Sequence, residues 1–160
     1  MKRICLILCL LGLSVTINAQ AKYGSMDYTV KINVSKEVDS TFLTFSFMSR
    51  TLKMSDPPKL LLRLMDDTVI SLDGSLLSTS NTTTGSVMVG NTALPVNYIV
   101  TEAKFPIAKE QIEQFKKGIK KLRLNTSPKY HEKEWRKDKI GMKLFESYKE
   151  CRAKSFEDGF

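Results

Sequence analysis

The chain has 160 residues, of which 42% are hydrophobic and 26% are charged, and its formal net charge at pH 7 is +8. This length suffices for one domain with a hydrophobic core but not for two domains of ordinary size. A single histidine excludes a multi-histidine metal site, and neither of the two common glycine-rich phosphate-binding motifs occurs in the chain. No cofactor is therefore expected.

The first residues have the layout of a secretory signal peptide. Lys2 and Arg3 are basic, and residues 4–15 are almost wholly apolar. Small residues then follow in an A-x-A-like pattern that ends at Ala21. The apolar run is shorter than the roughly 20 residues that cross a bilayer, which disfavours a transmembrane anchor. We expect cleavage after Ala19 or Ala21, a single domain over residues 22–160, and a protein that is periplasmic, held on the outer surface or secreted.

Removal of the signal would leave one cysteine. Cys5 and Cys9 lie in the signal, so Cys151 has no second mature cysteine with which to form an internal disulfide and is expected to remain a thiol. The charge is also unevenly distributed. Residues 22–103 carry seven basic and eight acidic side chains, whereas residues 104–160 carry sixteen and nine. The basic excess thus lies in the C-terminal part.

The N-terminal part of the domain predicts two half-buried strands. Residues 28–34 alternate strictly between apolar and polar side chains, and residues 41–50 repeat the pattern. The predicted inward side chains are Tyr28, Val30, Ile32, Val34, Leu43, Phe45 and Phe47. Residues 35–40 are predicted to connect the two strands. Two prolines, at 57 and 58, break the chain before the next strand because proline cannot donate to a sheet ladder.

Residues 59–74 predict a β-hairpin around the turn-forming pair Asp66-Asp67. A two-residue loop would set Leu64 opposite Val69. A three-residue loop, residues 66–68, sets Leu64 opposite Ile70 and Leu62 opposite Leu72, with Arg63 opposite Ser71. Burial should select the second register, because it gathers the large aliphatic side chains on one face.

After Gly74 the pattern weakens. The polar residues 78–86 are predicted to form a loop or a ragged edge strand. β-Character resumes at 87–89 and at 96–105, with a turn expected at Gly90-Asn91. Pro95 should keep the start of the later strand from being central in a sheet.

The last third predicts two helical segments. Residues 108–117 carry acidic side chains early, lysines late and Gly118 just beyond, as a helix prefers, and residues 119–125 return to strand. A second helical segment is predicted over residues 128–156, with Pro128 at its first position. Ile140, Leu144, Tyr148 and Cys151 form its apolar stripe.

No catalytic constellation stands out. His131 lies in a charged segment, and pairing it with Cys151 as a nucleophile and base has no motif to support it. Asp66-Asp67 could form an acid/base or metal-binding pair, but adjacent carboxylates at a hairpin tip are usually solvated turn residues. Neither a catalytic nor a metal-ligating residue is therefore assigned.

One basic cluster carries functional content. Lys116, Lys117, Lys120, Lys121 and Arg123 could bind a glycan, a nucleic acid or an anionic membrane surface. A solvated face is the favoured interpretation, because lysines at a helix end and on an outward strand face are ordinary. Base-stacking aromatic residues are not interleaved, which disfavours nucleic acid. Glu110 and Glu113 are expected to neutralise part of the cluster by pairing along the helix.

The strings Phe105-Pro-Ile-Ala-Lys-Glu-Gln-Ile112, Gly118-Ile-Lys-Lys-Leu-Arg-Leu124 and Lys137-Asp-Lys-Ile-Gly141 carry a resemblance. The chain resembles uncharacterised small secreted proteins of gut Gram-negative bacteria, and a signal that ends in Ala19-Gln20 fits that group. The resemblance covers the hairpin and the C-terminal third. It implies a bacterial exported protein and carries over no catalytic residue.

The sequence therefore predicts a mainly-β (α+β) domain, an antiparallel β-sandwich or partly open barrel with one inserted helix and a C-terminal helix. The expected function is a non-catalytic exported module that binds a protein or a surface ligand. Three further functions stay open: an anion-binding protein that uses the basic C-terminal part, a lipocalin-like carrier, and a small hydrolase with an unrecognised carboxylate site.

Overall fold

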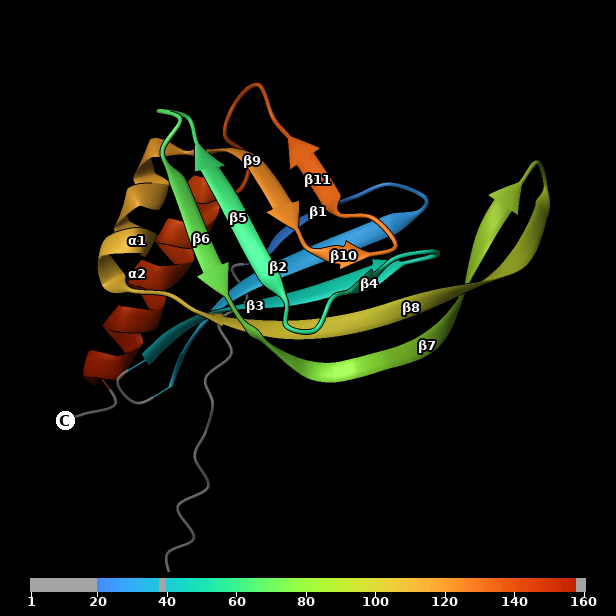
Figure 1. Ribbon diagram of the computed structural model, residues 1–160, viewed down its shortest axis with the longest axis horizontal. Coiled ribbons are helices and arrows are strands. Elements are labelled where there is room, and N and C mark those ends of the chain that lie inside the picture. Colours follow the sequence, from blue (N-terminus) through green and yellow to red (C-terminus); the bar gives the residue numbers. More distant parts are fainter. Residues whose placement is uncertain (1–19, 38–39, 158–160) are drawn as a thin grey trace, which may run out of the picture.

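Two antiparallel sheets share one hydrophobic core in the computed structural model, which describes residues 20–37 and 40–157 (Figure 1). The first sheet contains, in spatial order, β1 (Ala21–Gly24), β2 (Tyr28–Glu37), β3 (Ser40–Ser49), β8 (Thr92–Pro106) and β7 (Ser75–Val89). The second contains β11 (His131–Glu134), β9 (Ile119–Leu124), β5 (Lys59–Leu64) and β6 (Val69–Asp73). A short pair joins β4 (Lys53–Met54) to β10 (Thr126–Ser127). The predicted mainly-β class with antiparallel strands is confirmed.

The core lies where the alternating patterns place it. Ile32 of β2 and Phe45 of β3 are fully buried, as are Leu62 and Leu122 from the second sheet. The ring of Phe45 meets that of Phe105 from β8 edge to face, with 5.4 Å between centroids. Each such side chain stabilises the fold by about 1.5–3 kcal/mol through burial. The predicted inward faces of the first two long strands are confirmed.

The β5–β6 hairpin buries the predicted face but in a different register. All four predicted aliphatic side chains are buried, namely Leu62, Leu64, Ile70 and Leu72. The predicted pairs were wrong, because Leu62, not Leu64, lies opposite Ile70. Likewise Arg63 lies opposite the exposed Val69 rather than Ser71. The shift is two residues, so every side chain keeps its face.

The turn accounts for the difference in register. The backbone N–H of Leu64 donates to the carbonyl O of Thr68 at 2.8 Å, which leaves Met65, Asp66 and Asp67 in the loop. Asp67 adopts a positive φ of 65°. A left-handed third residue is the usual geometry of a three-residue hairpin loop, and aspartate tolerates it better than threonine would. The loop therefore starts one residue earlier than predicted.

β7 and β8 form the longest hairpin of the described chain. Of the two alternatives predicted for residues 78–86, the ragged edge strand is confirmed and the loop is not, since these residues belong to β7, the edge strand of the first sheet, whose pairing is irregular as far as Asn81. The expected turn at Gly90-Asn91 is confirmed, with Val89 opposite Thr92 and φ of Gly90 at 62°. Pro95 lies in β8, but β3 pairs with β8 only as far as Ile99. The proline therefore occupies the part of β8 with β7 alone beside it.

The inserted helix is confirmed. α1 (Lys109–Glu113) continues into a 3₁₀ turn, η1 (Gln114–Lys117), between β8 and β9. Gly118 ends it at φ 81°, where a Cβ atom would lie 2.7 Å from the side chain of Asp138. A glycine is required there both by the backbone conformation and by the space.

The predicted start of the C-terminal helix was wrong. Residues 126–127 form β10, and His131–Glu134 form β11, which pairs with β9. The helix α2 runs instead from Gly141 to Glu157. Its predicted stripe is confirmed, since Ile140, Leu144, Tyr148 and Cys151 are all buried.

Asp138 explains why the helix begins where it does. Its Oδ1 accepts backbone N–H bonds from Ile140 and Gly141, and its Oδ2 accepts one from Met142. Oδ1 also accepts the N–H of Ile119, the first residue of β9. Burial acts to raise the pKa of this carboxyl, but the backbone donors prevail and the pKa is lowered. One carboxylate thus caps α2 and ties it to the second sheet.

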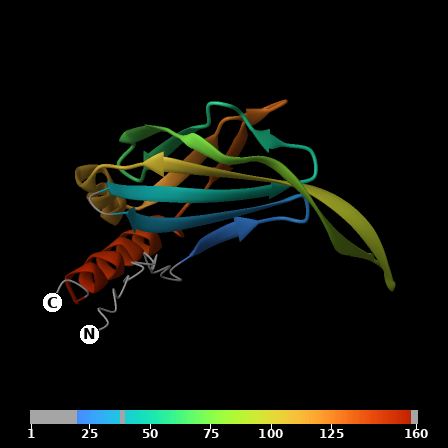
Figure 2. The ribbon, with the colours of Figure 1, turned by 90° about the horizontal axis from the view of Figure 1, so that it is seen from below.

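The helices and the β7–β8 hairpin lie at opposite ends of the molecule (Figures 1 and 2). The predicted signal peptide falls on residues 1–19, which lie outside the described residues, and on Gln20 and Ala21, of which Ala21 is in β1. None of the helices within residues 20–37 and 40–157 combines the length and the apolar character that crossing a lipid bilayer requires.

Candidate functional site

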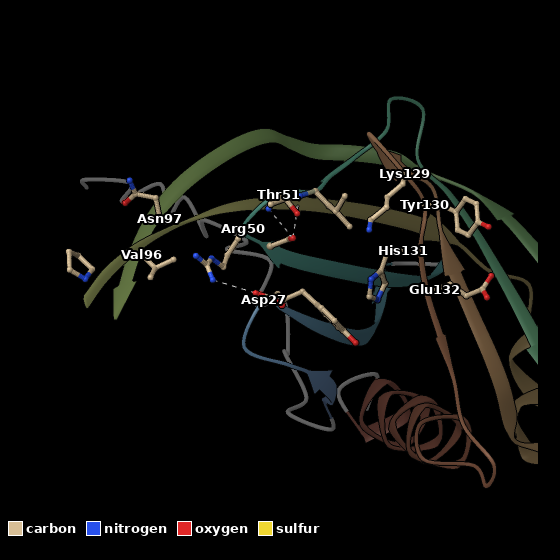
Figure 3. A pocket seen from close by; sticks show the side chains of 13 residues that line it. Asp27, Arg50, Thr51, Val96, Asn97, Lys129, Tyr130, His131 and Glu132 are labelled. Atoms are coloured by element: carbon tan, nitrogen blue, oxygen red, sulfur yellow. Dashed lines mark hydrogen bonds and ion pairs between the residues drawn. The ribbon is translucent and has the colours of Figure 1, made fainter. Parts of the chain in front are cut away.

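A groove of about 980 Å³ opens at the end of the first sheet, between the β7–β8 hairpin and the segment that leads into β11 (Figure 3). Its lining comes from the β1–β2 connection, the end of β3, the outer part of β8 and the start of β11. The lining residues are Asp27, Tyr28, Ser49, Arg50, Thr51, Leu52, Pro95, Val96, Asn97, Lys129, Tyr130, His131 and Glu132.

The groove exists because β8 extends past the last residue of β3. The last pair between them joins Ser49 to Ile99, whereas β8 begins at Thr92. Beyond Ser49 the chain turns away, because the Ser49 Oγ accepts the backbone N–H groups of Thr51 at 3.3 Å and of Leu52 at 3.2 Å. The outer part of β8 is thereby left with β7 on one side and the groove on the other.

Charged side chains of both signs line the groove. Arg50 Nη1 lies 3.4 Å from the Asp27 carboxylate, and both side chains are largely exposed. Glu132 accepts hydrogen bonds from Lys121 and Arg123. Both bonds lower the pKa of its carboxyl, and the bond from Lys121 has the larger effect. An exposed ion pair such as Asp27–Arg50 contributes little stability. Asp27 and Arg50 can therefore each give up this ion pair and contact a charged ligand instead.

The single histidine closes one end of the groove, where it packs among aromatic rings. His131 is 6% exposed, with the ring of Tyr28 at 4.5 Å and that of Phe47 at 5.2 Å between centroids. Its Nε2 lies 3.3 Å from the Tyr23 hydroxyl. Burial, with a smaller contribution from Lys133, lowers the pKa of His131 to about 4. The imidazole is thus neutral at physiological pH.

Tyr23 supports this histidine from β1. Its ring stacks on His131 at 6.0 Å and meets Trp135 edge to face at 5.1 Å. Burial, and then the neighbouring Tyr28, raise the pKa of its hydroxyl. Sequence reasoning missed this cluster, because its members come from β1, β2, β3 and β11 and no local spacing joins them. The occurrence of one histidine in the chain was the only signal.

The residues proposed from the sequence are not brought together with His131. Cys151 is buried in α2, and its Sγ lies 3.7 Å from the carbonyl O of Val34. Asp66 and Asp67 are exposed at the hairpin tip, where the hydrogen bond from Lys117 is the main cause that lowers the pKa of Asp66 to about 2. Within the described ranges, no group of three or more His, Cys, Asp and Glu side chains could hold a metal ion.

The five basic residues of the candidate anion-binding patch lie among acidic and aromatic groups. Lys117 pairs with Asp66 at 2.6 Å, and Lys120 pairs with Asp67 at 2.9 Å. Lys121 and Arg123 share Glu132, at 2.5 and 2.7 Å. Lys116 Nζ lies 4.6 Å from the centre of the Phe145 ring. The pairing carboxylates come from the β5–β6 turn and from β11, not from Glu110 and Glu113 as expected.

We predict that His131 makes stability depend on pH. Because its pKa is about 4 when folded and 6.5 otherwise, only the unfolded chain takes up this proton between those values. As the pH is lowered through this interval, His131 should reduce the free energy of unfolding by roughly 3 kcal/mol, and this residue should contribute no further loss below it. Urea unfolding at several pH values should show a weaker dependence for His131→Phe, which keeps an aromatic ring. Equal slopes in both proteins would contradict this.

We predict weak, salt-sensitive retention on heparin. Each cation of the patch already contacts a carboxylate or a ring, so the protein should elute below physiological salt. The triple variant Lys120→Glu, Lys121→Glu and Arg123→Glu should elute only slightly earlier. Retention of the unaltered protein beyond physiological salt, lost in the triple variant, would instead favour an anion-binding function.

Comparison with known proteins identifies no relative: no protein-family model matches the chain, and no match was found among curated proteins or solved structures. What the groove binds has to follow from its own residues.

Proposed function

We propose that the protein is an exported, non-catalytic binding module that holds an extended segment of a partner protein in the groove, alongside β8. The observation that carries this proposal is the unequal length of β3 and β8. From Thr92 to Tyr98, β8 has β7 on one side only, and the groove lies beside Pro95–Asn97 on the other. A partner strand there would continue the position of β3, as in β-strand addition.

The hairpin turn decides which backbone groups of β8 are available. Residues that flank a two-residue loop form a hydrogen-bonded pair, and hydrogen-bonded and non-hydrogen-bonded pairs then alternate. With Val89 and Thr92 as the first pair, the N–H and C=O groups of Asn97 point away from β7. Pro95 has the same orientation and lacks an N–H, as suits an edge position. Asn97 would thus supply both a donor and an acceptor to a bound strand.

The side chains of the groove indicate the character of the partner segment. Arg50 and Lys129 offer positive charge and Asp27 offers negative charge from the same lining, whereas the Glu132 carboxylate is already paired with Lys121 and Arg123. Tyr130 is 56% exposed and presents an aromatic ring to solvent. These groups suit a polar peptide with charges of both signs and an apolar or aromatic side chain. They suit a purely anionic polymer less well.

The same residues disfavour a hydrolase and a lipocalin-like carrier. A general acid needs a raised carboxyl pKa, whereas the pKa of Glu132 in the groove is lowered. His131 is neutral, and its described polar contact is the Tyr23 hydroxyl rather than a nucleophile. A carrier needs an apolar cavity inside the sheet, but Phe45 and Phe105 fill the space between the sheets and the groove lining is charged.

Burial of Ala21 favours the earlier of the two expected cleavage sites. Ala21 is fully buried in β1, where it pairs with Ile32. Cleavage after Ala21 would remove that side chain and one pair of the β1–β2 ladder. Cleavage after Ala19 would keep both. The compartment after export, whether periplasm, outer surface or medium, follows from neither residue.

We therefore predict that the exported protein begins at Gln20. Intact-mass analysis of protein recovered from the cell envelope or medium should give the mass of residues 20–160, with the loss of ammonia that an N-terminal glutamine undergoes. An N-terminus at Lys22 would contradict the structural argument for the site, and an intact Met1 would contradict export itself.

We predict that a photo-reactive residue in the groove captures the partner. Benzoylphenylalanine in place of Asn97 should give a discrete cross-linked product in cells that make the protein naturally. The same residue in place of Lys31, exposed on β2 away from the groove, should give none. Adducts of equal yield from both positions, or none from Asn97, would contradict the proposal.

Asn97→Pro provides the matched test of strand addition. This change removes the outward N–H and leaves the β7–β8 hydrogen bonds in place, at the cost of one exposed contact with Thr84. Binding of the captured partner should fall at least tenfold while the melting temperature changes little. Arg50→Glu, which reverses one wall charge, should weaken binding in a salt-dependent way. Full binding by Asn97→Pro would exclude backbone pairing.

A further inference from the structure

The β7–β8 hairpin carries no charged side chain from Ser75 to Thr101. From Gly74 to Thr101 the chain has 28 consecutive residues without Asp, Glu, Lys, Arg or His, in a protein of which 26% is charged. The hairpin projects from the body of the molecule in both views (Figures 1 and 2). A two-stranded ribbon is only marginally stable in water by itself. Its outer part therefore gains from a further strand.

β7 differs from the other sheet edges of the described chain. β1 has 4 residues and β6 has 5, and β6 ends in Asp73, which pairs with Lys59. β11 has 4 residues, three of them charged. Short length and charge are the usual devices that prevent edge pairing. β7 has 15 residues and neither device.

The outer part of β7 is also regular. The irregularities in its pairing with β8 lie between Leu76 and Asn81, and the pairs from Asn81 to Val89 follow one another without a break. Because Val89 and Thr92 form the hydrogen-bonded pair at the turn, the outward backbone groups are those of Thr82, Thr84, Ser86 and Met88. Within residues 20–37 and 40–157, β7 pairs with β8 and with no other strand.

We propose that two copies of this protein pair through β7, antiparallel about a two-fold axis, to form one continuous sheet. In such a pairing each side chain faces residues of the same strand in the other copy, so any charge near the axis would meet its like. The absence of charge removes that repulsion. Thr83, Thr84 and Ser86 supply side chains that hydrogen-bond across strands. The apolar Val87 and Val89, the latter 59% exposed, gain neighbours from the partner strand.

The distribution of charge favours a second copy at this edge over any other. Residues 22–160 carry twenty-three basic and seventeen acidic side chains, none of them between Gly74 and Thr101, so two bodies brought together would repel each other. The part of β8 beyond β3, from Thr92 to Tyr98, extends about 23 Å at roughly 3.3 Å per residue. That is more than twice the Debye length of about 8 Å at physiological salt. Pairing through the ribbon keeps the basic bodies apart.

This inference does not depend on the groove, which lies on the opposite edge of the ribbon. The test compares two proline variants in protein purified after export of the full-length chain. Thr84→Pro removes an outward N–H from β7, whereas Ala93→Pro removes one from the other edge of the hairpin, on β8. Neither change removes a backbone hydrogen bond between β7 and β8, although Thr84→Pro does remove the exposed side-chain bond from Thr84 Oγ1 to Asn97 Oδ1. Sedimentation velocity should find the unaltered protein and Ala93→Pro to be dimers and Thr84→Pro to be a monomer.

A second variant decides the matter if Thr84→Pro does not fold. Thr84→Lys combined with Ser86→Lys places like charges beside the two-fold axis and should give a folded monomer at low salt, as judged by circular dichroism. A monomeric unaltered protein at hundreds of micromolar would overturn the proposal. So would a folded Thr84→Pro, or the folded double lysine variant, that remains as dimeric as the unaltered protein.

Discussion

β8 pairs with β7 from Thr92 to Lys104 but with β3 only from Ile99 to Pro106, and much of the molecule depends on this difference. From Ile99 to Lys104 it lies between β3 and β7, and Ala103 and the following Phe105 enter the core. From Thr92 to Tyr98 it has β7 alone. The buried part anchors the strand, so the exposed part can extend without packing of its own. Both the groove and the charge-free edge of β7 follow from this arrangement.

The C-terminal segment completes the groove from the far side. After β9, the chain returns through β10 and β11 before α2 begins, and this return places His131 against Tyr28 and Phe47. The ring is held by aromatic neighbours rather than by charge, which is why burial dominates its titration. Asp138 then caps α2 and ties it to the second sheet, because its carboxylate accepts the backbone N–H groups of Gly141 and of Ile119, the first residue of β9.

The charged residues are organised by tertiary contacts rather than by position in the chain. The basic excess of residues 104–160 meets acidic groups that come from elsewhere: Asp66 and Asp67 of the β5–β6 turn pair with Lys117 and Lys120. Glu132 of β11 joins Lys121 and Arg123. These exposed pairs add little stability. They do lower the density of unopposed positive charge beside the helices.

The sequence by itself determined which side chains of β2, β3, β5 and β6 face inward, where the inserted helix ends and where the long hairpin turns. Alternation of period two, a glycine at a positive φ and a Gly-Asn pair act within a few residues, so they can be interpreted without a partner. The hairpin register shows the limit. Residues 59–74 specified the buried face, but the two-residue shift between the predicted and observed pairs keeps that face and was not visible in the pattern.

Tertiary structure alone decided the rest. Residues 126–134 carry too few apolar side chains to predict a strand. They form β10 and β11 because β4 and β9 have open edges with which they can pair. The aromatic surroundings of His131, the ion pairs of the basic patch and the groove all join segments far apart in the chain. Such contacts have no local period. The residues that make these contacts come together only in the folded chain, in which β8 extends past the end of β3.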